Sequence, residues 1–334
     1  MIQPPAITVF MAVYNGSRYL KEAIGSVLAQ TFSNFELLII NDGSNDNSVE
    51  IIQSYTDPRI RLLHNDINRG LVFTRQRGVS EARGEYLAIL DCDDIALPER
   101  LQIQYDFFQH NPNIALCSGR ARYIDANGET TGESPLVRGD KNVLLIFGNF
   151  LINSAVMVKI EAVKSVGSYH ANAPAEDYDL AMRLSACFPI EIIDDILVKY
   201  RIHEQNISMQ DFSHQTRVEK NIFRDFHQRF GLKTNERVVD LHHTLLSHKT
   251  QAFSLNEYYS FFVDLISNDQ LRRAYNLEPL REALFHRWYE LVMKKGDEKS
   301  LALLFSPKIF NSKYLTFKQL RRAFKKSLKE FFKE

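Results

Sequence analysis

Four short apolar runs alternate with helical patterns over residues 7–90, and this alternation is the strongest constraint on the fold. The runs are Ile7–Val13, Phe35–Ile40, Ile60–His64 and Tyr86–Leu90. Apolar residues recur at helical spacing after Ser17, which we predict to be an N-cap. Strand, turn and helix at this interval predict parallel strands with right-handed crossovers, covered on both faces. The predicted fold class is therefore α/β, with a Rossmann-like, mostly parallel central sheet flanked by helices.

Polar loops follow three of these strands. Tyr14-Asn15 follows the first strand, Asp42 the second, and Asp91-Cys92-Asp93-Asp94 the fourth. In open α/β sheets the loops after the strands form the ligand crevice, so we expect these three loops to converge. Alone, an Asp-Gly pair is more often a plain turn.

The acidic loop predicts a divalent cation site. Carboxylate oxygens suit Mg²⁺ or Mn²⁺, which usually binds one or two carboxylates while substrate phosphates complete the shell. A nucleoside diphosphate substrate is therefore expected. The alternative for an isolated Asp cluster is a solvated acidic loop.

A series of sequence blocks, in order over about the first 210 residues, resembles the family 2 inverting glycosyltransferases of the GT-A fold. The blocks include Val13-Tyr14-Asn15-Gly16, Asn41-Asp42-Gly43-Ser44, Leu90-Asp91-Cys92-Asp93-Asp94, Ala175-Glu176-Asp177-Tyr178-Asp179-Leu180 and Tyr200-Arg201-Ile202-His203. Each block alone is a weak signal, but their order makes the resemblance specific.

The resemblance implies roles on the nucleotide side. Asp42 matches the residue that reads the nucleobase, Asp93 the metal-binding residue of the Asp-x-Asp motif, and Asp91 its partner toward the ribose or the metal's water. The implied nucleotide-binding set is Val13, Tyr14, Asn15, Asp42, Arg75, Asp91 and Cys92. An Arg on a helix, such as Arg75, is otherwise usually just solvated.

The resemblance also implies a catalytic and acceptor side. Asp177 matches the general base, and His203 matches a diphosphate or metal contact. The implied acceptor or support residues are Glu176, Asp94 and Asn153, the last within a predicted strand at 149–157, where relatives often carry a His. For the Glu176-Asp177 pair the alternative is helix capping, and for His203 a structural hydrogen bond.

Some positions depart from the family pattern. Ala12, Asn41, Gln76 and Ala181 stand where Pro, Asp, Asn and Trp are common. None of these departures removes a presumed catalytic carboxylate, so they bear on substrate detail rather than on reaction type.

The implied activity is that of a metal-dependent inverting glycosyltransferase of the hexosyltransferase type, using Mn²⁺ or Mg²⁺. It would move a sugar from a UDP- or dTDP-sugar to a hydroxyl of a glycan or lipid-linked acceptor in bacterial surface polysaccharide synthesis. One alternative is a sugar-nucleotide nucleotidyltransferase, which would need a Gly-rich basic loop after the first strand. Another is a non-enzymatic nucleotide-sugar-binding protein at a membrane surface, which would not need Asp177.

The chain is predicted to have three parts: residues 1–211, for which the resemblance implies a GT-A nucleotide-sugar-binding and catalytic domain, residues 212–305 as a helical accessory region, and residues 306–334 as a basic amphipathic C-terminal helix. The three cysteines show neither even pairing nor metal-ligand spacing and predict reduced thiols. We expect a cytoplasmic enzyme, since no signal peptide is recognised before Ile7 and no apolar run reaches the ~20 residues of a membrane span. No nucleic-acid partner is expected.

Helical patterns without strand signals follow residue 211. The predicted helices are Val218–Phe230, Glu236–His248, Leu255–Ser267 and Leu280–Lys294. His242, His243 and His248 lack acidic or Cys partners at ligand spacing and are predicted to be ordinary helix-surface residues.

The C-terminal segment is basic and amphipathic. From Lys308 onward there are nine Lys or Arg against two Glu. Over Leu315–Glu334, large apolar side chains share one helical face: Phe317, Leu320, Phe324, Leu328 and Phe331. This pattern predicts a helix at an anionic membrane surface, on the inner face of the cell membrane. The alternatives are docking on its own domain or in a homo-oligomer.

Overall fold

The computed structural model describes residues 4–170, 174–204, 206, 212–247, 250–295 and 302–331. The chain forms two compact units. The first, here the α/β unit, comprises Met1–Lys141 and Phe150–Val218; the second, the helical unit, comprises Asn142–Asn149 and Glu219–Glu334. The predicted boundaries at residues 211 and 305 stay predictions.

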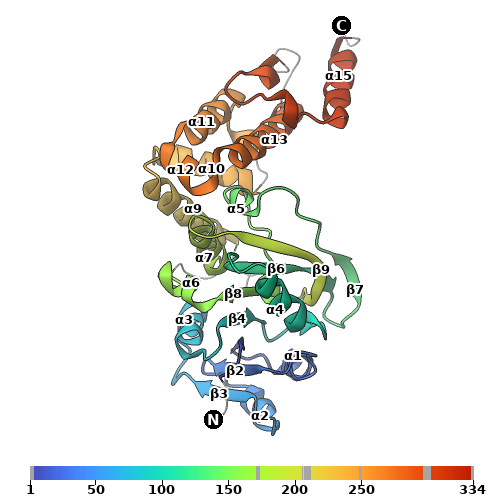
Figure 1. The fold of residues 1–334 in the computed structure, drawn as a ribbon, viewed down its shortest axis with the longest axis vertical. Helices are drawn as coiled ribbons and strands as arrows, with labels where there is room; N and C mark the ends of the chain where they lie inside the picture. The colour runs from blue at the N-terminus through green and yellow to red at the C-terminus, as the bar shows by residue number, and fades with distance from the viewer. Residues whose placement is uncertain are drawn as a thin grey trace. The chain divides into compact units, whose positions relative to one another are not determined.

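The α/β unit alternates strands and helices as predicted (Figure 1). Its elements are β1 (Ile7–Val13), α1 (Ser17–Leu28), β2 (Phe35–Asn41), α2 (Ser48–Gln53), β3 (Ile60–His64), α3 (Leu71–Glu81), β4 (Tyr86–Ile89), β5 (Ile95–Ala96), α4 (Arg100–His110), β6 (Leu116–Ile124), β7 (Thr130–Glu133), β8 (Val156–Lys159), α6 (Ile160–Ser165), α7 (Glu176–Ser185) and β9 (Ile190–Arg201). The short helix α5 (Lys141–Leu145) belongs, apart from Lys141, to the helical unit.

The strands form one sheet in the order β3-β2-β1-β4-β8-β6-β9-β5, with β7 paired to β6. The strands predicted from the sequence, β1 to β4, pair in parallel, which confirms the Rossmann-like half. The later strand β8 pairs antiparallel with both β4 and β6, while β6 and β9 are parallel. The carboxyl ends of the parallel strands β1 to β4 therefore lie at one edge of the sheet, where the predicted ligand loops begin.

Helices cover both faces of this sheet. In Figure 1, α3 and α6 lie along one face and α1 and α4 along the other. Alternate residues of β1 point to opposite faces: Val9 and Met11 join the core under α1, whereas the Phe10 ring packs under Gly78 of α3. The near-continuous apolar strands are explained by this double coverage.

Two local predictions in the α/β unit are wrong. Ser17 is the first helical residue of α1 rather than its N-cap, and its N–H donates to Asp46 Oδ2 at 3.0 Å. The predicted strand at 149–157 begins only at Val156, because Asn153–Ala155 form a 3₁₀ turn. Ser17 bonds Asp46 and Asn153 bonds Asp91, so in both places the structure depends on a residue distant in sequence.

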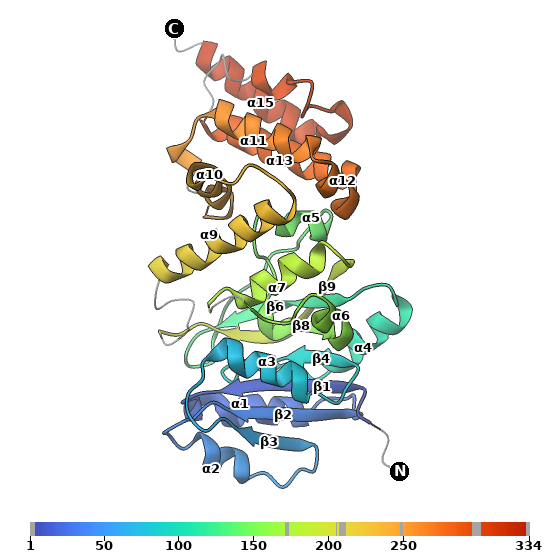
Figure 2. The ribbon, with the colours of Figure 1, turned by 90° about the vertical axis from the view of Figure 1, so that its left-hand side faces the viewer.

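The helical unit contains α9 (Phe212–Arg229, which begins in the α/β unit), α10 (Glu236–Ser247), α11 (Leu255–Ser267), α12 (Asp269–Tyr275), α13 (Leu277–Lys295), α15 (Phe317–Phe331) and short 3₁₀ turns at Thr250–Ala252, Ala302–Phe305 and Ser312–Tyr314 (Figure 2). Ser254 and Glu257 form a capping box at the start of α11, exactly where the predicted helix begins. Pro279 lies in the first turn of α13, where its missing N–H costs nothing.

The prediction for the helical-unit histidines is wrong at two positions. His242 and His243 are buried, with 0% and 8% of their surfaces exposed. His242 Nε2 donates to the carbonyl of Ile146 at 2.7 Å, and His243 bonds Glu219 at 2.8 Å. His248 lies outside the described residues.

Across the described ranges of the chain, no helix combines the length and the apolar character needed to cross a bilayer.

Candidate active site

The loops after β1 and β2 are tied to one another. Asn15 adopts a positive φ of 51°, its N–H donates to Ser44 Oγ at 3.0 Å, and its Oδ1 accepts the N–H of Asn45 at 2.8 Å. Tyr14 beside it is 48% exposed. The Asn15 side chain thus holds the two loops together, and the Tyr14 ring is exposed. Contacts of Tyr14 and Asn15 with a nucleotide stay predictions.

Asp42 is buried and holds the loop that starts α3. Its Oδ1 accepts hydrogen bonds from Asn65 Nδ2 at 2.6 Å and the N–H of Arg69 at 2.9 Å, and its Oδ2 accepts the N–H of Gly70 at 2.9 Å. A carboxylate oxygen has room for a second donor, so Oδ2 can still accept a base N–H. Reading of the nucleobase by Asp42 stays a prediction.

The acidic loop packs directly against the loop after β1. A Cβ added to Gly16 would lie 2.8 Å from Cys92 Sγ, so a larger residue at this position would require the Cys92 side chain to move. Burial raises the pKa of the Cys92 thiol well above its usual range, and the neighbouring aspartates add to the effect. Val13 is fully buried, so any nucleotide contact there would come from its backbone.

Asp91 meets the acceptor-side turn. Its carboxylate accepts Asn153 Nδ2 at 3.1 and 3.3 Å and the Ser154 hydroxyl at 3.2 Å, while its own N–H donates to Ser154 Oγ at 3.1 Å. The 3₁₀ turn at Asn153–Ala155 is what presents these two side chains. The structure therefore brings Asn153 beside the acidic motif, and its implied role toward the acceptor stays a prediction.

Asp93 pairs with His203. His203 Nε2 lies 2.9 Å from Asp93 Oδ2, and its ring centroid lies 5.1 Å from that of Tyr19. Burial and the charge of Asp91 raise the pKa of Asp93, although the hydrogen bond from His203 opposes this. Residues 110 positions apart are thus assembled at one end of the sheet.

Asp94 is a support rather than an open ligand. It is 1% exposed, and its Oδ1 accepts the N–H of Arg201 at 2.7 Å. Burial, reinforced by Asp93 and Asp91, raises the pKa of this carboxyl well above its usual range. A neutral Asp94 fits its enclosed position.

Arg75 links the acidic motif to α7. Arg75 is 4% exposed, and its guanidinium pairs with Glu176 and lies 3.4 Å from Asp91 Oδ1. Glu176 is itself 2% exposed. Asp91 and the start of α7 are therefore joined by one buried cation, and phosphate contact by Arg75 stays a prediction.

Asp177 follows Glu176 in the first turn of α7, as predicted from its helical pattern. Burial and the neighbouring Glu176 raise the pKa of Asp177 to about 7, while Arg75 and the N–H of Tyr178 act in the opposite direction. A carboxyl with a pKa near neutrality is suited to accept a proton in the reaction.

The donor set fits a divalent cation that shares its shell with substrate. No group of three or more His, Cys, Asp or Glu forms a metal cage in the part of the chain that the structure describes. Asp93 offers carboxylate oxygen and His203 offers Nε2 as ligands, and burial together with the charge of Asp91 raises the pKa of Asp93. A bound cation would offset the like charge of Asp91. Mg²⁺ and Mn²⁺ commonly bind through so few protein groups, with phosphates as further ligands.

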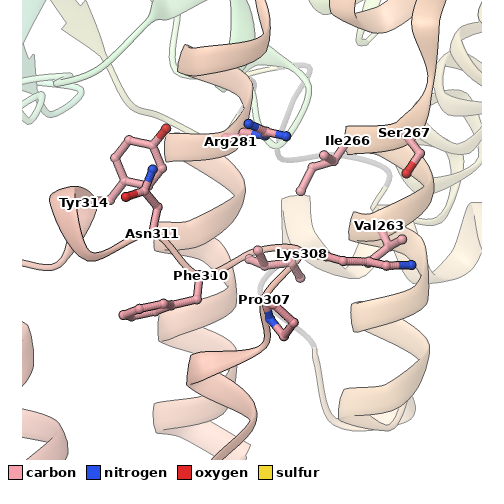
Figure 3. Close-up of a pocket in the computed structure, with 10 residues that line it drawn as sticks. Val263, Ile266, Ser267, Arg281, Pro307, Lys308, Phe310, Asn311 and Tyr314 are labelled. Atoms are coloured by element: carbon pink, nitrogen blue, oxygen red, sulfur yellow. The ribbon is translucent and has the colours of Figure 1, made fainter.

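A cavity of about 380 Å³ lies in the helical unit, between α11, α13 and residues 307–314 (Figure 3). Arg281 and Lys308 are its charged lining residues, beside apolar ones such as Ile266 and Phe310. It has no carboxylate in its lining, so it lacks the groups for the chemistry considered above.

Four residues that organise the site have no role predicted from the sequence: Tyr19, Glu22, Ser154 and Arg201. Arg201 Nε donates to the Asp93 carbonyl at 2.9 Å, its Nη2 donates to Glu22 at 2.6 Å, and its guanidinium lies 4.3 Å from the Tyr19 ring. Ser154 makes the paired contacts with Asp91. The position of Arg201 two residues before His203 was the only signal in the sequence.

The model of the family described as "Glycosyl transferase family 2" matches residues 8–163. An uncharacterized glycosyltransferase, MJ1057, of Methanocaldococcus jannaschii is 36% identical over 206 residues, covering 59% of this chain and 71% of that protein. The O-antigen biosynthesis glycosyltransferase WbnJ of Escherichia coli is 31% identical over 207 residues, covering 60% of this chain and 81% of that protein.

Solved structures agree on the fold. TarS of S. aureus in complex with UDP-GlcNAc superposes with a TM-score of 0.60 at 17% identity, covering 97% of this chain and 89% of that one. The mannosyltransferase PcManGT from Pyrobaculum calidifontis, in complex with GDP-Man and Mn²⁺, gives 0.54 at 12% identity, covering 100% and 89%. The predicted GT-A fold is confirmed, and the chain belongs to glycosyl transferase family 2.

Proposed function

We propose that this glycosyltransferase moves a sugar, with inversion, from a UDP- or dTDP-sugar to a hydroxyl of a glycan or lipid-linked acceptor. The observation that carries the proposal is the buried link Glu176–Arg75–Asp91, which joins the helix bearing the proposed base to the acidic motif. The likeness in sequence to an O-antigen biosynthesis glycosyltransferase supports surface polysaccharide synthesis as the setting.

Asp177 is the proposed general base. As the acceptor hydroxyl attacks the anomeric carbon, it must lose its proton, and a carboxylate on the side opposite the leaving diphosphate can take it. In-line attack of this kind inverts the anomeric centre. The dipole of α7 favours the ionised form of a carboxylate in its first turn, and the Arg75 cation acts in the same direction.

Asp93 and His203 are the residues proposed to hold Mn²⁺ or Mg²⁺ together with the diphosphate. A bound divalent cation stabilises charge on the leaving group by several kcal/mol. Asp91 keeps its hydrogen bonds to Asn153 and Ser154 and faces the nucleotide or a metal-bound water. Tyr14 and Asp42 complete the proposed nucleotide side.

The proposal is tested by titrating UDP into the protein calorimetrically with and without Mn²⁺. Asp93→Asn keeps shape but removes one anionic ligand, so we expect UDP binding to lose its Mn²⁺ dependence while the fold is retained. Asp264→Asn, which neutralises an exposed carboxylate of α11, is the matched control and should bind like the wild type. Mn²⁺-stimulated binding that survives in Asp93→Asn would refute the metal assignment.

A further inference from the structure

The last described helix, α15, starts at a locally encoded signal. The Thr316 N–H donates to Gln319 Oε1 at 3.0 Å, and the Gln319 N–H donates back to Thr316 Oγ1 at 3.2 Å. This reciprocal pair is a capping box, which fixes where the helix begins and hence which residues share each of its faces.

α15 contacts α13 through its polar side. The Tyr289 hydroxyl donates to the Gln319 carbonyl at 2.8 Å, Arg322 pairs with Glu290 at 3.2 Å, and Lys326 Nζ donates to the Met293 carbonyl at 2.9 Å. Gln319, Arg322 and Lys326 recur at helical spacing and so form one face of the helix.

The apolar side of α15 faces away from this contact. Phe317, Leu320 and Phe324 are 82%, 47% and 65% exposed. At 100° per residue, their mean direction lies roughly 160° from that of the polar contact face. A helix that docks on its own domain ordinarily buries its apolar face, and α15 does the reverse.

Unpaired cations lie beside this exposed face. Lys318, Arg321 and Lys325 are exposed, and within the described residues they make no hydrogen bond or ion pair. Glu290 of α13 is already paired with Arg322. The surface therefore joins an aromatic and aliphatic face to a positively charged flank.

We propose that this face of α15 docks on an anionic membrane surface. Apolar side chains of an amphipathic helix enter the boundary between headgroups and acyl chains, and flanking Lys and Arg side chains bind anionic lipid headgroups. Antiparallel pairing with α15 of a second copy about a two-fold axis would bring these unpaired cations against their own kind, which charge repulsion opposes. The proposal does not depend on the reaction assigned to the α/β unit.

The test is co-sedimentation of the full chain with vesicles of phosphatidylcholine, alone or mixed with phosphatidylserine. We expect binding to the mixed vesicles that weakens as salt is added. Phe324→Gln should weaken it about tenfold, since a large apolar side chain is no longer buried. Arg321→Gln with Lys325→Gln should weaken it by about fivefold for each charge.

The matched controls make the same kinds of substitution at exposed positions outside α15. Leu136→Gln alters an apolar side chain that is 45% exposed, and Lys21→Gln with Lys233→Gln removes two exposed cations; both should bind vesicles like the wild type. Circular dichroism verifies the fold of each variant. Absence of vesicle binding by the full chain, or binding that Phe324→Gln leaves unchanged, overturns the proposal. A dimer in sedimentation velocity that Phe324→Gln abolishes, without vesicle binding, assigns the face to a second copy instead.

Discussion

Arg75 shows at the scale of one residue how the site is held together. Removing its cation leaves the buried Glu176 carboxylate without a counter-charge, so Arg75→Met should lower the free energy of unfolding by about 3–5 kcal/mol. Urea unfolding followed by circular dichroism measures this change. Adding Glu176→Gln to Arg75→Met removes the stranded charge and should recover part of the loss. A loss below about 1 kcal/mol in the single variant, or no recovery in the double variant, would contradict the role given to the ion pair.

The carboxylates of the site could be predicted from the sequence, whereas their partners could not. Asp91, Asp93 and Asp177 lie in short motifs beside a strand end or a helix start, which local patterns reveal. Arg201 and Tyr19 act through a contact between residues 182 positions apart, and no local pattern carries that information. The apolar residues around Asn153 predict a strand, and the 3₁₀ turn that brings its side chain to Asp91 has no local sequence signal.

At the scale of elements, two helical glycines predict opposite effects of the same substitution. A Cβ at Gly78 of α3 would lie 2.5 Å from the Phe10 ring, so Gly78→Ala should cost about 1–3 kcal/mol through overpacking. A Cβ at Gly25 of α1 meets no atom within 4 Å, so Gly25→Ala should stabilise by about 0.5–1 kcal/mol through its helix propensity. Thermal unfolding of the two variants measures both signs, and equal shifts would contradict the described packing of α3 on β1.

The parallel half of the sheet and most helices could be predicted from the sequence, because hydrophobic periodicity and turn residues are local signals. The burial of His242 could not be predicted, because helical periodicity does not reveal that residues 142–149 contact α10. The Ile146 carbonyl requires an N–H from His242 Nε2, so His242 Nδ1 must accept from His227 Nε2 at 3.0 Å. His242 is therefore neutral. His227 Nδ1 is buried without a hydrogen-bond partner among the described residues, and burial lowers the pKa of His227 to about 4, so this imidazole is neutral near pH 7 as well.

At the scale of the whole molecule, we expect acid to lower the free energy of unfolding of the helical unit, and Trp288 fluorescence can follow this unit separately. Burial lowers the pKa of His227 to about 4 and that of His242 well below its usual range. Between their ordinary pKa of 6.5 and about 4, the unfolded chain binds protons that the folded unit does not, so the free energy of unfolding falls as pH falls. Trp288, the single tryptophan of the chain, is buried in this unit and reports its unfolding.

Urea unfolding followed by Trp288 fluorescence tests this linkage. His227→Leu removes one titrating group, so the dependence of the unfolding free energy on pH should become shallower by about 1 kcal/mol per pH unit within that window. An unchanged pH dependence would mean that the buried imidazoles are not the groups that respond.

The central claim is that Asp177 takes the proton of the attacking hydroxyl, and one pH–rate profile tests it most directly. Release of UDP from a UDP-sugar in the presence of Mn²⁺ is measured for wild type and Asp177→Asn, after calorimetry has shown that both bind UDP equally. Because burial and Glu176 raise the pKa of Asp177 to about 7, the wild-type rate should fall about tenfold per pH unit below that value and level off above it. Asp177→Asn should be slower by about 10²–10⁴-fold with no inflection near pH 7. A variant that turns over at the wild-type rate, or a wild-type profile that is flat through pH 7, would contradict the assignment of Asp177 as the base.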